Sequence, residues 1–72
     1  PLEGLIDFEQ ERKRLENQMN KLNTEMQQLN NQLKNENFVA KAPAEKVQEL
    51  RDRVSDIEQR TKVLHQTIEA LE

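Results

Sequence analysis

A heptad repeat of apolar residues, interrupted once, is the feature that most constrains how this chain can fold. Apolar residues recur at alternating spacings of three and four from Leu5 to Leu33, and again from Val47 to Leu71. This spacing places them in one stripe along each of two helices. The stretch 37–43, Asn-Phe-Val-Ala-Lys-Ala-Pro, breaks the repeat. Because this connection is too short for parallel helices, the sequence predicts an all-α, two-helix antiparallel coiled-coil hairpin.

Composition agrees with a thin helical rod. The chain has 72 residues, of which 33% are hydrophobic and 35% charged, which is enough for one seam but not for a globular core. It has no cysteine, so we expect no disulfide and no cysteine-based metal site. No run of apolar residues is long enough to suggest a membrane span, and we expect a cytoplasmic protein. The chain begins at Pro1 without a methionine, which indicates a fragment of a larger protein.

Capping residues predict where the helices begin. Asp7 is a good N-cap, and Gln10 three residues later completes a capping-box pattern. Pro43 suits the first position of the second helix, since the N–H that proline lacks would be unpaired there. The predicted elements of this single arm, residues 1–72, are a first helix, a tip and a second helix, spanning about residues 7–35, 36–42 and 43–71.

Two registers satisfy the apolar pattern. The first pairs Met19 with Ile57 and Phe8 with Ile68, and it uses both ends of the repeat. A shift of one heptad leaves Leu5 and Phe8 without partners, so the first register is preferred. That register also predicts two cross-helix charged pairs beside the seam, Glu25 with Arg53 and Glu9 with His65.

Two polar residues interrupt the predicted seam. Arg12 occupies an a position of the first helix and Thr61 an a position of the second. One interpretation is that they specify the register, with Arg12 extending its charge outward over an apolar stem. The alternative is that Arg12 reaches a ligand.

Enzymatic chemistry has no candidate residues here. His65 is the single histidine, there is no cysteine, and no glycine-rich loop could hold a phosphate. At its flanking position His65 is interpreted as a surface residue. We therefore expect no catalytic site, no metal site and no cofactor in this chain.

Four basic residues form a predicted cationic group on one side of the rod. In the preferred register Arg14 lies level with Arg60, and Lys21 lies level with Arg53. Such a group could bind two or three phosphates, despite a formal net charge of -3. The alternative is an ordinary charged surface, because four carboxylates share that side: Glu11, Glu25, Glu49 and Asp56.

The tip allows two interpretations as well. Phe38 could fold back and close the end of the seam, or it could be exposed as an apolar contact point beside Lys41. A simple turn requires neither residue, because glycine, asparagine and aspartate suffice for it.

The tip and the opening of the chain together resemble one family. The stretch Asn35-Glu36-Asn37-Phe38-Val39, followed by Ala-Lys-Ala-Pro, and the opening Gly4-Leu5-Ile6-Asp7 before an Arg/Glu-rich helix resemble the C-terminal arm of bacterial valyl-tRNA synthetases. The resemblance covers essentially the whole chain. It implies a tRNA-binding appendage of a class I synthetase, whose valine- and ATP-binding domains lie elsewhere.

In that family the arm lies along the outer corner of tRNA, where the D and T loops meet. The resemblance implies valine-accepting tRNA and the rest of the synthetase as partners, and a homodimer of the isolated fragment is a further expectation. The alternative function is a protein-interaction or spacer hairpin. The predicted RNA contacts come from the register argument and from the matched motifs: Arg14, Lys21, Lys41, Arg53 and Arg60.

Overall fold

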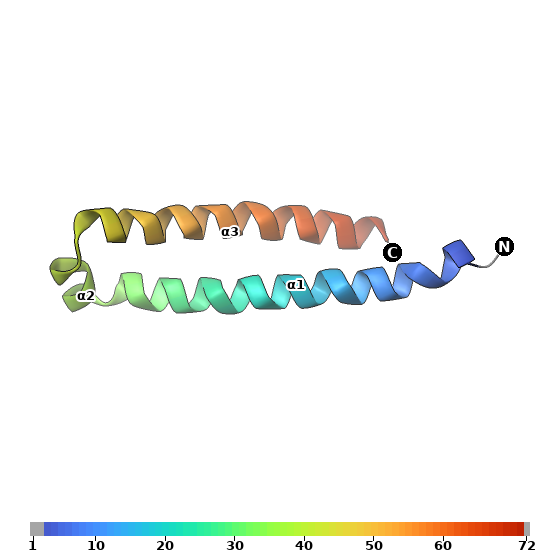
Figure 1. Cartoon of the computed structure of the whole chain (residues 1–72), viewed down its shortest axis with the longest axis horizontal. Coiled ribbons are helices and arrows are strands. Elements are labelled where there is room, and N and C mark those ends of the chain that lie inside the picture. The colour runs from blue at the N-terminus through green and yellow to red at the C-terminus, as the bar shows by residue number, and fades with distance from the viewer. Residues whose placement is uncertain (1–2, 72) are drawn as a thin grey trace.

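The computed structural model describes residues 3–71, with the side chains of residues 7–71. Helix α1 (Glu3–Lys34) is followed by the short helix α2 (Glu36–Lys41) and by α3 (Ala44–Ala70). Helices α1 and α3 run antiparallel side by side, with α2 at the turn between them (Figure 1). The Cα atoms extend over 60 × 14 × 14 Å. The helices and the packing of α1 against α3 confirm the predicted all-α hairpin. Within the described residues, no helix is long and apolar enough to cross a membrane.

Helix α1 begins earlier than predicted. It starts at Glu3, so Asp7 lies inside the helix and the prediction of an N-cap at Asp7 is wrong. The apolar repeat already includes Leu5, and a single glycine at position 4 costs a helix only about 1 kcal/mol. The capping motif was therefore a weaker determinant than continuation of the repeat. Pro1 and Leu2, the first part of the predicted opening segment, lie outside the described residues.

The tip is helical rather than irregular. Asn35 leaves the helical conformation and caps α2: its Oδ1 accepts hydrogen bonds from the backbone N–H groups of Asn37, at 3.0 Å, and Phe38, at 3.2 Å. Pro43 is the N-cap of α3, with φ -57° and ψ 143°, and Ala44 is the first helical residue. The prediction for Pro43 was thus wrong by one position. The extended ψ of Pro43 turns the chain from α2 into α3.

The seam contains the buried residues of the described chain. Ile57 is fully buried, with an exposed fraction of 0%. The other buried apolar residues are Leu15, Leu29, Leu50 and Ile68. Burying a side chain of this size contributes roughly 1.5–3 kcal/mol, so a few residues hold the two helices together.

The preferred register is wrong. It pairs Met19 with Ile57, yet the buried hydrophobic cluster and the residues packed against it include Ile57 but not Met19. Phe8, which it pairs with Ile68, is 53% exposed while Ile68 is buried. Instead, the residues that join this cluster are those that the register shifted by one heptad would stack in successive layers: Leu22, Met26, Leu29, Leu33, Leu50, Val54 and Ile57.

The tip explains why the shifted register wins. In this register Leu33 packs at the level of Leu50, and Phe38 closes that end of the cluster. The burial of apolar residues gained at the tip is accompanied by a loss of burial at the other end. There α1 projects beyond the end of α3 (Figure 1), and Phe8 is exposed. The further predicted pair of Leu5 with Leu71 lies outside the described side chains.

Candidate nucleic-acid interface

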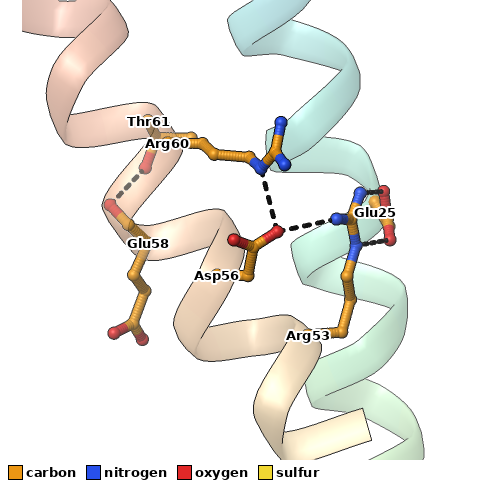
Figure 2. Close-up of polar contacts among 6 residues, drawn as sticks. All are labelled: Glu25, Arg53, Asp56, Glu58, Arg60 and Thr61. Carbon is orange, nitrogen blue, oxygen red and sulfur yellow. Dashed lines mark hydrogen bonds and ion pairs between the residues drawn. The ribbon is translucent and has the colours of Figure 1, made fainter. Parts of the chain in front are cut away.

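A bidentate ion pair joins the two long helices. Arg53 of α3 donates from Nε to Glu25 Oε2 at 2.6 Å and from Nη2 to Glu25 Oε1 at 2.9 Å (Figure 2). This is the pair that the sequence predicted, and it is confirmed. It survives the change of register because both residues flank the seam on the same side and have long side chains. Parallel N–H···O bonds of this kind fix geometry as well as charge.

Asp56 extends the pair into a network along α3. Its Oδ2 accepts from Arg53 Nη1 at 2.9 Å and from Arg60 Nε at 2.9 Å (Figure 2). The side-chain hydrogen bonds from Arg53 lower the pKa of Glu25 below its ordinary value. We call Glu25, Arg53, Asp56 and Arg60 the charged network. Two of its members are predicted RNA contacts, and both already have carboxylate partners.

Arg14 is also paired within its own helix. It donates from Nε to Glu11 Oε2 at 3.1 Å, and its Nη2 contacts Glu11 Oε1. These hydrogen bonds lower the pKa of Glu11. Lys21, in contrast, has no ion pair with any described residue. The predicted group of four cations therefore consists of three paired arginines and one lysine whose ammonium group is open to a ligand.

The structure brings Lys21 together with Arg60 rather than with Arg53. These two residues line a shallow groove between α1 and α3 on the side of the charged network. The regrouping follows from the shifted register, in which Lys21 lies opposite a later segment of α3. The groove is lined by Gln18, Lys21, Leu22, Gln59, Arg60, Val63 and Leu64.

The other predicted charged pair does not form. Glu9 accepts instead from Arg12 Nη2 at 2.6 Å, and His65 Nε2 lies 2.8 Å from Glu69 Oε1. The prediction of a Glu9–His65 pair is wrong because it depended on the unshifted register. Arg12 also lies 3.9 Å from Glu16, so carboxylates of its own helix occupy its guanidinium group.

Thr61 likewise satisfies its hydroxyl group locally. Its Oγ1 donates to the backbone carbonyl of Glu58 at 3.1 Å, within α3. Both polar residues of the predicted seam, Arg12 and Thr61, thus have partners on their own helices, and the interpretation that they specify the register stays a prediction.

The tip residues divide between packing and exposure. Phe38 is half-buried and packs against the seam cluster, so the interpretation that it closes the end of the seam is confirmed. Lys41, the last residue of α2, is exposed, and no described carboxylate pairs with it. The charge of Lys41 therefore faces solvent at the tip, as does that of Glu36 at the other end of α2.

Sequence reasoning missed a second groove on the other side of the seam. Lys34 of α1 and Arg51 of α3 both line it, both are exposed, and neither has an ion pair among the described residues. The remaining lining residues are Asn30, Leu33, Val54, Ser55 and Glu58. Only the shifted register brings Lys34 and Arg51 toward one another, so the preferred register could not reveal them.

A metal centre is not part of either groove. Within residues 7–71, no group of three or more His, Cys, Asp or Glu side chains is arranged to hold a metal ion. What both grooves offer is an ammonium group and a guanidinium group from different helices, which together can hydrogen-bond anionic oxygen atoms.

The Glu25–Arg53 pair makes hairpin stability depend on pH. Because the folded-state pKa of Glu25 is lowered from 4.5, its contribution is present above that value and is lost as the pH falls through the folded-state pKa. We expect the urea midpoint of the chain, measured by circular dichroism, to decrease when the pH is lowered from 6 to 3. The decrease should be smaller in the Glu25→Gln variant. An equal fall in both proteins would show that the pair contributes nothing to this pH dependence.

These features define a class of protein: an antiparallel coiled-coil arm that carries cations along its flanks. The chain belongs to the family of valyl-tRNA synthetase tRNA-binding arms, whose family model matches residues 7–72. It is 55% identical over 64 residues to the valine–tRNA ligase of Anoxybacillus flavithermus, and 50% identical over 64 residues to that of Geobacillus stearothermophilus. Each match covers 88% of this chain.

A more distant relative matches nearly the whole chain. The valine–tRNA ligase of Syntrophotalea carbinolica is 38% identical over 71 residues, which cover 99% of this chain and 8% of that protein. The Anoxybacillus and Geobacillus matches each cover 7% of the relative. The chain thus spans a small fraction of the length of these ligases. No solved structure matches it significantly.

Proposed function

We propose that this chain is the arm by which a valine–tRNA ligase holds its tRNA during ATP-dependent attachment of valine, at the corner where the D and T loops meet. The observation that carries the proposal is the family match over residues 7–72. The cations on both flanks of the rod support it. In this proposal, ATP and valine bind to other domains of the ligase, and the enzyme acts in the cytoplasm.

The proposed contacts are made to the RNA backbone. Folded RNA surfaces are recognised mostly by shape and by phosphate and 2′-hydroxyl contacts, for which an extended rod with scattered cations is suited. Lys21 and Lys41 can donate hydrogen bonds directly to a phosphate, since neither has a described carboxylate partner. Arg14, Arg53 and Arg60 would bind phosphate while sharing or releasing a carboxylate.

The experiment is deletion of the arm from the ligase that carries it. We expect the Kd for tRNA at moderate salt to rise at least roughly tenfold, because several phosphate contacts are lost, and kcat/KM for tRNA charging to fall with it. Valine activation by ATP, measured without tRNA, is the control and should not change. Unaltered tRNA affinity and charging would instead favour a spacer hairpin.

A further inference from the structure

The second groove combines cations from two helices near the tip. Lys34 is the last residue of α1, and Arg51 lies in the second turn of α3. They are separated by 16 intervening residues, and the hairpin turn brings them to the rims of one groove. The groove floor includes Leu33 and Val54, which pack against the buried cluster. The two cations therefore lie beside the buried cluster that joins the two long helices.

The cations of this groove form no ion pairs with the described residues. No described carboxylate forms an ion pair with Lys34 or Arg51, whereas Arg53 and Arg60 are both held by Asp56. Glu58 also lines the groove and is the single acidic residue there. An anion would thus meet two open cations in this groove, but two occupied ones in the charged network.

The groove faces away from the charged network. Side chains two positions apart in a helix point in directions that differ by about 200°. Arg51 and Arg53 therefore point to opposite sides of α3. An RNA strand that lies on Lys34 and Arg51 is therefore not the one that lies on Arg53.

We propose that the groove between Lys34 and Arg51 is a further site for the phosphodiester backbone of RNA, on the side of the arm opposite the charged network. The proposal rests on the proposed tRNA-binding function and assigns it a location. An ammonium and a guanidinium group supply donors for phosphate oxygens, and the half-buried Asn30 and exposed Ser55 add polar groups suited to a ribose hydroxyl. Charge complementarity selects this occupant: the open groups are cationic, and the RNA backbone is anionic.

The test uses the ligase that carries this arm, with the substitutions Lys34→Ala and Arg51→Ala together. We measure the Kd for tRNA between about 50 and 200 mM salt. Each lost phosphate contact reduces the magnitude of the slope of log K against log salt, where K is the association constant, by about 0.7–0.9. The double variant should therefore show a slope shallower by about 1.4–1.8, and a Kd roughly tenfold higher at the lower salt.

A matched control removes the same charge elsewhere. Lys13 and Lys62 are exposed and have no described ion pair, and neither lines the groove, so the double alanine variant should change Kd by less than about threefold. An equal loss in this control would overturn the proposed site, because net charge alone would explain it.

A third variant separates the two proposals. If Lys21→Ala with Arg60→Ala weakens tRNA binding while Lys34→Ala with Arg51→Ala does not, the groove proposal fails but the tRNA-binding function stands. If neither variant nor deletion of the arm changes tRNA affinity, the proposed function itself fails.

Discussion

Replacing Ile57 by alanine is expected to unfold much of the hairpin. Ile57 is fully buried and belongs to the cluster in which residues of both long helices meet. Such a substitution costs about 2–5 kcal/mol, and a small domain has only about 5 kcal/mol or less to lose. Far-UV circular dichroism of the chain during urea titration should show a much lower midpoint and a reduced helical signal before urea is added.

Val63 provides the matched control for this substitution. It lies on the same helix, is also β-branched, and is 60% exposed, so Val63→Ala should change the free energy of unfolding by no more than about 0.5 kcal/mol. Alanine has a higher helix propensity than isoleucine or valine, so unchanged or increased stability in both variants would mean that helix propensity, and not the seam, holds the chain together.

The helices were predictable because their determinants are local. Apolar spacing of three and four over many turns allows few alternatives to a pair of long helices, and the structure agrees from Leu15 to Ile68. The tip was harder, since its helix depends on one capping side chain: Asn35 holds two backbone N–H groups. That asparagine belongs to the tip motif that resembles the family, so part of the motif is explained by folding.

The register could not be determined from the spacing of apolar residues. A shift of one heptad leaves every a and d position in the seam, so periodicity cannot choose between the two alignments. What decides is the comparison of the two ends: closing Phe38 and Leu33 over Leu50 at the tip, against covering Phe8 at the base. Such a comparison needs the geometry of α2, which the repeat does not contain.

The prediction of the candidate interface depended on the same unknown, the register of the two helices. The predicted pair of Arg53 with Glu25 forms because both residues flank the seam on the same side and their long side chains still meet after the shift. Predicting which cations stay open to a ligand required knowing every carboxylate partner. Asp56 forms ion pairs with both Arg53 and Arg60. Lys34 and Arg51 line one groove, which only the shifted register forms. The tip, explained by packing at Phe38, adds only Lys41 as an RNA-binding candidate.

Among the substitutions in the arm, reversing the charges of the network should have the largest effect on tRNA binding. In the ligase that carries this arm, Arg53→Glu with Arg60→Glu removes two proposed phosphate contacts and replaces them with repulsion. At about 0.7–0.9 per contact, the salt slope should fall by about 1.4–1.8, and Kd at 0.1 M salt should rise roughly thirtyfold. Titration of labelled tRNA at several salt concentrations measures both quantities.

The decisive comparison neutralises the other half of the network. Glu25→Gln with Asp56→Asn breaks the same ion pairs but leaves both arginines charged and released. If Arg53 and Arg60 bind RNA, this variant should bind tRNA more tightly than the unmodified ligase, because phosphate no longer competes with carboxylates. If the arginines serve only to hold the helices together, both double variants should weaken tRNA binding, since both break the network. Opposite signs therefore identify a binding role, and equal signs identify a structural one.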